Sequence, residues 1–156
     1  MKLRWFALVV TVFAVAALVI PSVASAVRRP LFAALNGQNE IAQDGRRGAG
    51  DRNGAGSFSA VIKGRQLCYG LAVRDIGDPI GAHIHRGRRN VNNPDFVVAL
   101  RPPQSGDAGS SSDCVTLRER LIRQIRGNPG QYYVNVHTRA FPRGAVRGQL
   151  FSRGGP

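Results

Sequence analysis

The amino-acid sequence predicts a mainly β protein: an antiparallel β-sandwich or barrel with one short α-helix near residues 117–126. Short runs in which apolar and polar residues alternate recur along the chain, as in strands that bury one face. Turns rich in Gly and Pro separate these runs. A single segment has its apolar residues at helical spacing. The 156 residues suffice for one domain with a core, and no internal repeat divides them.

The first 26 residues have the layout of a secretory signal peptide. Lys2 and Arg4 precede an apolar run of 16 residues, Trp5–Ile20, and Ala24–Ala26 forms a small-x-small cleavage motif. The alternative is a membrane anchor, but a span needs about 20 apolar residues. We therefore predict export, cleavage after residue 26, and one mature domain over residues 27–156 with no membrane span. The protein would be secreted or held in the cell envelope.

The first half of the mature chain contains three predicted strands. Leu31–Asn36 is the first, and a loop rich in Gly, Arg and Asp follows at Gln43–Gly56. Ser57–Lys63 and Gln66–Arg74 both alternate, and the two residues between them, Gly64-Arg65, predict a tight β-hairpin.

The middle of the chain predicts two short strands between polar loops. Ile80–Arg86 alternates and carries two histidines, and a basic loop extends over Arg86–Asp95. Phe96–Leu100 is a short apolar strand. Pro102–Asp113, which includes three consecutive serines, is predicted to be another loop.

The predicted helix follows this loop. Thr116 and Glu119 have the spacing of a capping box, in which each side chain accepts from a backbone amide of the first turn. Gly127, with a proline two residues later, predicts its end. The apolar stripe that would pack on the core consists of Leu117, Leu121, Ile122 and Ile125. Two further strands, Gln131–Thr138 and Ala145–Phe151, complete the prediction.

The three histidines of the chain are its most distinctive polar feature. His83 and His85 lie two residues apart in a predicted strand, so both imidazoles point to the same face of the sheet, about 6.6 Å apart. His137 joins them if the strand over residues 131–138 lies alongside. Three imidazoles with an open fourth position are typical of zinc or copper sites.

The alternative is a polar ligand-binding face without a metal. The neighbouring strands would then contribute Asn135, Arg147 and Gln149 to the same face as the histidines, connected by cross-strand hydrogen bonds. The abundance of arginine argues against a bound cation, and neither histidine-bearing strand carries a carboxylate to offset it. This interpretation needs no cofactor, whereas the first needs copper or zinc. No catalytic residues are predicted.

Cys68 and Cys114 are the two cysteines of the chain. Disulfides persist in the oxidising compartments that an exported protein reaches, so we predict a disulfide between them. Two separate buried thiols are the alternative. A bridge that closes so long a loop would stabilise the fold by about 4 kcal/mol in the chain-entropy model.

The chain is strongly basic, with 22 Lys and Arg against 9 Asp and Glu and a net charge of +13. We predict that two basic loops contact an anionic polymer of the cell envelope or the extracellular space. An arginine-biased composition is the alternative explanation of the charge. Few aromatic residues accompany these arginines, so no specific nucleic-acid binding is predicted. The basic residues of the two loops are Arg46, Arg47, Arg86, Arg88 and Arg89.

Five motifs in fixed order resemble the CHRD domain, the module named after chordin. They are Leu35–Glu40, Ala82–Gly87, Tyr132–Thr138, Phe141–Gly144 and Arg147–Leu150. The resemblance covers about residues 31–151 and implies a secreted or surface β-sandwich without an established enzymatic activity. In chordin-like proteins these modules accompany growth-factor-binding parts, but this chain lacks the cysteine-rich segments that would carry that role.

A weaker resemblance is to copper-zinc superoxide dismutase, a Greek-key β-protein in which a His-x-His pair on a strand holds copper, as His83 and His85 would here. That site uses four copper-binding histidines, whereas this chain has three in total. No further cluster of histidines with an aspartate follows to hold zinc. The resemblance therefore implies a superoxide-dismutase-like fold and an altered metal site, and not dismutase activity.

Two functional hypotheses follow from the sequence. The first is an exported CHRD module with a non-enzymatic binding or structural role outside the cell and an unspecified ligand. The alternative is a small copper- or zinc-binding protein that uses a three-histidine surface site.

Overall fold

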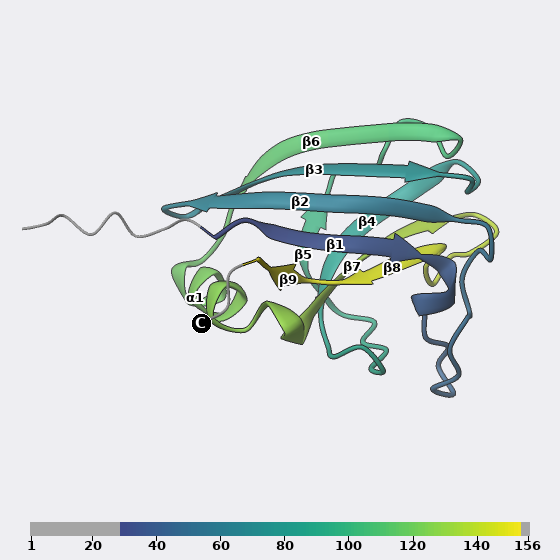
Figure 1. Cartoon of the computed structure of the whole chain (residues 1–156), viewed down its shortest axis with the longest axis horizontal. Coiled ribbons are helices and arrows are strands. Elements are labelled where there is room, and N and C mark those ends of the chain that lie inside the picture. The colour runs from purple at the N-terminus through teal and green to yellow at the C-terminus, as the bar shows by residue number, and fades with distance from the viewer. Residues whose placement is uncertain (1–28, 154–156) are drawn as a thin grey trace, which may run out of the picture.

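Nine strands and one α-helix make up the described part of the chain, residues 29–153, in the computed structural model (Figure 1). All strand pairs in this part are antiparallel. The strands are β1 (Leu31–Asn36), β2 (Ala55–Lys63), β3 (Gln66–Arg74), β4 (Pro79–Arg86), β5 (Phe96–Leu100), β6 (Ala108–Thr116), β7 (Tyr132–Thr138), β8 (Val146–Gln149) and β9 (Phe151–Ser152). The helices are α1 (Glu119–Gly127) and two short 3-10 helices, η1 (Gly37–Asn39) and η2 (Pro129–Gln131).

The strands form one sheet in the order β5-β4-β7-β8-β1-β2-β3-β6, and β9 pairs with β1. The sheet curls into a nearly closed barrel, with β1, β2, β3 and β6 nearer the viewer in Figure 1 and β4, β5, β7 and β8 behind them. Arg101 connects the two edge strands: its N–H donates to the Tyr69 hydroxyl, and its carbonyl accepts from Ser111 Oγ. The mainly β prediction is confirmed, whereas the superoxide-dismutase-like Greek-key sandwich stays a prediction.

The hydrophobic core lies inside this curved sheet, and α1 covers one end of it (Figure 1). In β2 and β3 every second residue is buried, because one face of these strands packs inward and the other meets solvent. The hairpin between them turns at Gly64 (φ +58°), as the sequence predicts. Helix α1 buries Ile122 and Ile125 from the predicted stripe. Strand β7 is different, because nearly all of its residues are buried on both faces.

Three loops cover the outer face of β4, β7 and β8. The β1–β2 loop (residues 37–54) and the β4–β5 loop (residues 87–95) project from the same side of the sheet (Figure 1). The third is the β7–β8 turn (residues 139–145). The loops are tied to one another and to the sheet through backbone hydrogen bonds, among them Asp51 N–H to the Ala145 carbonyl at 2.8 Å and Gly87 N–H to the Gln131 carbonyl at 2.7 Å.

The prediction of a loop over Pro102–Asp113 is wrong in its second half, where β6 begins at Ala108. Strand β6 pairs with β3 along its whole length, from Arg74↔Ala108 to Gln66↔Thr116. Strand β6 lies at the edge of the sheet and its side chains are mostly exposed. It therefore needs few apolar residues, and its serine-rich sequence is typical of a loop. Gly109 is required there, because a Cβ would collide with the Ser105 carbonyl.

The predicted capping box is also wrong. Thr116 ends β6, the N-cap of α1 is Arg118, and no side chain caps the first turn. The Leu117 N–H instead donates to the Arg65 carbonyl at 2.9 Å. Leu117 therefore lies in the connection between β6 and α1 and not in the helix. The last predicted strand is likewise interrupted at Leu150, whose N–H donates to the Tyr132 carbonyl between β8 and β9.

The predicted signal peptide over residues 1–26 lies outside the described residues, so it stays a prediction. Among residues 29–153, no helix has both the length and the apolar character that a membrane crossing requires.

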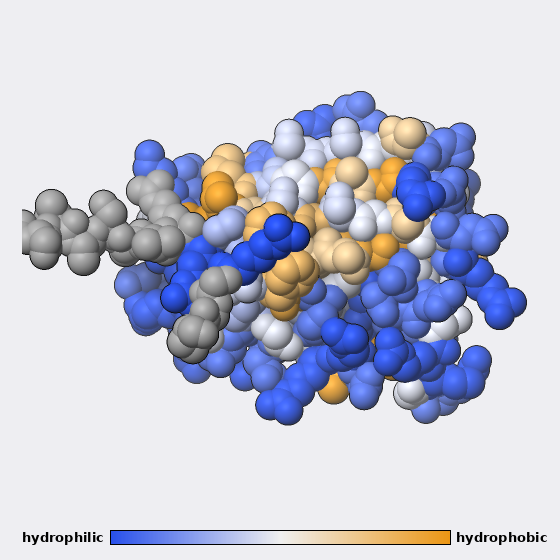
Figure 2. Space-filling view, viewed as in Figure 1, coloured by the Kyte–Doolittle hydropathy of each residue, from blue (hydrophilic) through white to orange (hydrophobic). Residues whose placement is uncertain are grey.

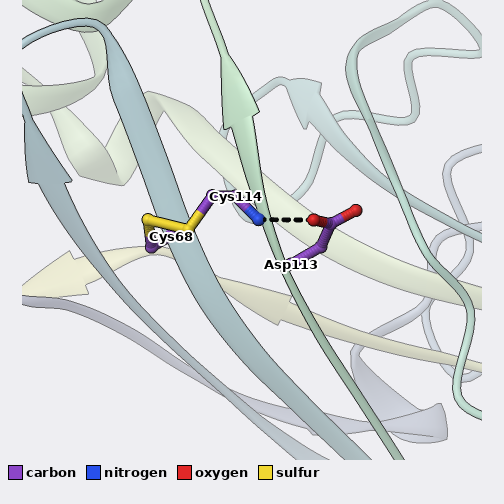
Figure 3. Close-up of a disulfide and its surroundings, with 3 residues drawn as sticks. All are labelled: Cys68, Asp113 and Cys114. Atoms are coloured by element: carbon purple, nitrogen blue, oxygen red, sulfur yellow. Dashed lines mark hydrogen bonds between the residues drawn. A yellow bond between two sulfur atoms is a disulfide. The ribbon is translucent and has the colours of Figure 1, made fainter.

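The predicted disulfide joins Cys68 of β3 to Cys114 of β6, which are direct partners in the register (Figure 3). The Asp113 carboxylate accepts from the Cys114 N–H at 2.7 Å beside it. The bridge therefore fastens an edge strand of low hydrophobicity to the sheet, where few apolar contacts would otherwise hold it.

Loss of this disulfide should lower the free energy of unfolding by about 4 kcal/mol, because the unfolded chain regains the entropy of an open loop. We expect the Cys68→Ala/Cys114→Ala variant and the wild-type protein in reductant to unfold at the same, lower urea concentration, followed by circular dichroism. A variant that unfolds at the same urea concentration as the oxidised wild type would contradict this expectation.

Candidate functional site

The polar residues singled out in the sequence lie in neighbouring rows across the outer face of the sheet. Register partners connect His83 of β4 to Asn135 of β7, Asn135 to Arg147 of β8, and Arg147 to Asn36 of β1. A second row connects His85 to Tyr133 and Tyr133 to Gln149. Antiparallel pairing therefore places side chains that are far apart in sequence next to one another.

The three imidazoles converge at one end of this face. His83 Nδ1 lies 3.1 Å from His137 Nε2, and one ligand nitrogen from each of His83, His85 and His137 lies within 4.8 Å of the other two. We call these three residues the histidine centre. The structure thus brings together the three histidines that the strand alternation predicts to share a face, and their role as ligands stays a prediction.

Backbone carbonyls fix the tautomers of two of these rings. His85 Nδ1 faces the Asp95 carbonyl at 3.1 Å, and His137 Nδ1 faces the Pro142 carbonyl at 3.0 Å. A carbonyl only accepts, so each Nδ1–H donates and each Nε2 carries a lone pair. His137 Nε2 lies 3.1 Å from Asn135 Oδ1, and His85 Nε2 is buried with no hydrogen-bond partner. Metal-binding histidines commonly have this arrangement.

Aromatic neighbours hold the rings in place. His83 stacks on Phe96 of β5, with ring centroids 4.3 Å apart and planes at 13°. His85 stacks on Tyr133 with centroids 4.9 Å apart and planes at 4°. The guanidinium of Arg147 lies 3.4 Å from the centre of the same Tyr133 ring. Because β7 lies between β4 and β8, the Tyr133 ring is flanked by His85 on one side and Arg147 on the other.

The histidine centre is not the surface site predicted from the sequence. His85 and Asn135 are buried, and His83 and His137 are partly buried, because the covering loops close over this face. Burial first, and then the charges of His137 and His85, lower the pKa of His83 to about 4. Burial also lowers the pKa of His85 and that of His137. All three rings are therefore neutral at neutral pH, which is the form that binds metals.

A buried ion pair lies next to the histidine centre. Arg147 is 1% exposed, and its Nη1 lies 3.6 Å from Oε1 of Glu40, a residue of the β1–β2 loop. Burial raises the pKa of Glu40, while the Ile41 N–H, which donates to the carboxylate, and Arg147 act in the opposite direction. Gly144 (φ +139°) packs on the same carboxylate, where a Cβ would collide with it. The positive charge of Arg147 is thus offset within the protein.

Arg147 and Gln149 fasten the β4–β5 loop to the sheet. Arg147 Nη2 donates to the carbonyls of Arg88 (3.0 Å) and Val91 (2.9 Å). Gln149 Nε2 faces three carbonyls, those of Gly87, Gly130 and Tyr132, at 2.8 to 2.9 Å. Both side chains therefore have a structural role, and contact with a ligand stays a prediction for each.

The predicted basic residues lie at the edge of the covered face. Arg46 pairs with Asp44 at 3.2 Å, Arg47 donates to Asn39 Oδ1 at 3.3 Å, and Arg88 lies against Gln131. Arg86 belongs to the end of β4, and Arg89 is exposed in the β4–β5 loop. Figure 2 shows hydrophilic residues along the margin where the two long loops lie, and hydrophobic residues over the strands.

Comparison with known proteins places this architecture in a family. The family model of the CHRD domain matches residues 31–150. The chain belongs to the CHRD domain family. No curated protein and no solved structure gave a significant match. The match spans every strand through β8, so the histidine centre and the Glu40–Arg147 pair both lie within the CHRD domain.

Sequence reasoning missed three residues that shape the site of this CHRD domain. Glu40 lies in a loop, where the alternation of apolar and polar residues does not show which way a side chain points. The sequence therefore contains no pattern that predicts its burial opposite Arg147. For Phe96 the sequence predicts only a place in an apolar strand, because its contact with His83 depends on the β4–β5 register. Asp95 contributes through its backbone carbonyl, which no side-chain pattern reports.

Removing either member of the buried ion pair should destabilise the CHRD domain by about 3–5 kcal/mol, because the remaining charged group stays buried without its partner. We expect Glu40→Gln and Arg147→Met each to lower the free energy of urea unfolding by this amount. The double variant should recover part of the loss, because it leaves no unpaired charge.

The exposed pair of Arg46 and Asp44 supplies the matched control. Its side chains are 75% and 59% exposed, so Arg46→Ala should leave the stability nearly unchanged. A Glu40→Gln variant no less stable than Arg46→Ala would show that the buried pair does not organise this face.

Proposed function

We propose that this chain is an exported CHRD module with a non-enzymatic binding role outside the cell, and that its histidine centre holds a zinc or copper ion. The observation that carries the metal site is the convergence of three neutral imidazoles, two of which have Nδ1 committed to backbone carbonyls. Membership of the CHRD family and the Cys68–Cys114 disulfide support a location in an oxidising compartment.

The hydrogen-bond inventory favours a cation. His137 Nε2 and His85 Nε2 both carry lone pairs, and Asn135 Oδ1 adds another acceptor 3.1 Å from the first. The single Nδ1 proton that His83 offers to His137 at 3.1 Å cannot satisfy all of these atoms. Protonation of an imidazole would relieve the excess, but burial opposes it. A bound metal ion supplies the missing positive charge without a proton.

The ligand set favours zinc or copper over other ions. Imidazole suits both metals, whereas calcium and magnesium take oxygen ligands. Within residues 29–153 the cluster contains the three histidines and no carboxylate. Bonds of about 2.0 Å to one ion place two nitrogens at most about 4.0 Å apart, so the ligand nitrogens, which lie within 4.8 Å of one another, would have to move closer together when a metal binds.

The second part of the proposed function concerns the exposed arginines. The charge of +13 and the gathering of arginines on the two long loops support contact with an anionic extracellular polymer. This role does not require the metal, because none of these arginines belongs to the histidine centre.

Export predicts a defined mature N-terminus. The full chain expressed in a host with a secretory pathway should appear outside the cytoplasm and begin at Val27, because Ala24–Ala26 presents the small residues that signal peptidase requires. N-terminal sequencing and intact mass measure this. An Ala24→Leu/Ala26→Leu variant should retain its leader, and an uncleaved wild-type protein would contradict the signal-peptide assignment.

Metal binding predicts one zinc or copper ion per chain. Protein without a histidine tag should bind one equivalent in calorimetric titration and elemental analysis, and the ion should raise the melting temperature, because it binds the folded state. His83→Gln and His137→Gln should each reduce affinity by at least about tenfold, as expected for the loss of one of three ligands.

Asp44→Asn is the matched control, because it removes an exposed carboxylate that is not part of the three-histidine cluster. It should leave stoichiometry and affinity unchanged. Absence of binding at micromolar metal, or binding that survives replacement of all three histidines, would eliminate the metal site and leave a metal-free polar network.

A further inference from the structure

Two adjoining hollows form a groove at the β1 end of the row that runs from His83 through Asn135 and Arg147 to Asn36. One, of about 560 Å³, lies against the β1–β2 loop, and the other, of about 190 Å³, lies over β1 and β8. Asn36 and Asn39 line both hollows, so the two adjoin along these residues. We call this feature the arginine groove, and its defining residues are Asn36, Asn39, Arg47, Arg52, Arg89 and Gln149.

The rim of the arginine groove carries uncompensated positive charge. Arg47, Arg52 and Arg89 are exposed and line the two hollows. The four salt bridges of the described chain involve none of them. The buried carboxylate of Glu40 is directed to Arg147 instead. Guanidinium groups bind carboxylates and related anions in a planar, bidentate manner, so the rim selects an anionic ligand.

Amide side chains fix the floor of the groove. Asn39 accepts a hydrogen bond from Arg47 through Oδ1 and donates one to the Arg147 carbonyl through Nδ2, both at 3.3 Å. Asn36 Oδ1 accepts from the Asn39 N–H at 2.9 Å. These groups are already held by the protein, so they lose little conformational freedom when a ligand binds.

Gln149 Oε1 belongs to a residue that lines the smaller hollow, is buried and lacks a hydrogen-bond partner. An unpaired buried acceptor costs free energy until a donor such as a water or a hydroxyl meets it. Phe151 lines the same hollow with 44% of its surface exposed and offers an apolar face.

We propose that the arginine groove binds an acidic polysaccharide. Carboxylate or sulfate groups along the polymer pair with Arg47, Arg52 and Arg89, sugar hydroxyls meet the amide floor, and the apolar face of one ring packs on Phe151. The proposal rests on the extracellular binding role proposed above and not on the metal. It narrows the anionic partner to a polymer that carries both hydroxyls and negative charges.

The test is calorimetric titration of the purified protein with an oligogalacturonate, which carries carboxylates, and with a heparin oligosaccharide, which carries mainly sulfates. Neutral dextran and a DNA duplex serve as comparison ligands. The Arg47→Gln/Arg52→Gln/Arg89→Gln variant should lose affinity for the preferred oligosaccharide by at least about tenfold, because three charge-assisted contacts are removed. Preference for one of the two oligosaccharides identifies the anionic group.

The matched control is Arg101→Gln/Arg118→Gln/Arg120→Gln, which removes the same charge from exposed positions that do not line the groove. It should retain affinity within about threefold, as expected if only general attraction is reduced. Equal losses in the two variants would overturn the groove while leaving an anionic partner. DNA binding as tight as oligosaccharide binding would overturn the sugar assignment. No binding to either oligosaccharide would overturn the groove and the proposed anionic partner together.

Discussion

The outer face of this sheet depends on the buried guanidinium of Arg147. A charge in the interior must be paired and hydrogen-bonded, so Glu40 is drawn in from one long loop and the Arg88 and Val91 carbonyls from another. Both loops therefore close over the strands. The same closure brings the Asp95 carbonyl to His85, so the imidazole orientation and the loop fastening have a common origin. The rigidity of the histidine centre comes from the loops as much as from the strands.

Alternation predicted most of the strands to within a few residues, because a sheet with one buried face imposes a period of two. It failed at β6, where the outer edge of the sheet removes the requirement for apolar residues and cross-strand hydrogen bonds alone define the strand. The capping motif at Thr116 and Glu119 also gave a wrong prediction, because Thr116 continues the pairing of β6 with β3 and is not free to cap the helix. Local signals are decisive where no tertiary partner competes.

The sequence also predicted which polar side chains share a face of the sheet. This depends only on the alternation of side chains along each strand and on which strands are paired. It did not predict burial, because coverage by loops depends on long-range closure. From the sequence, arginine near the histidines disfavours a bound metal cation, because neither histidine-bearing strand carries a carboxylate to offset the arginine charge. Glu40 removes this objection, since it faces Arg147 from a loop that strand parity does not describe. Loop residues thus set the electrostatics of a site whose ligand atoms come from strands.

The chain has three histidines in total, and all three belong to one cluster. Every imidazole signal in a magnetic resonance spectrum of the protein therefore originates from a single place, and no assignment by mutagenesis is needed to locate it. Chemical shifts of the ring nitrogens distinguish protonated, neutral and metal-bound forms, and the ring hydrogens respond to the stacked Phe96 and Tyr133. A small domain with no probe attached thus carries its own spectroscopic reporter at the position of greatest chemical interest.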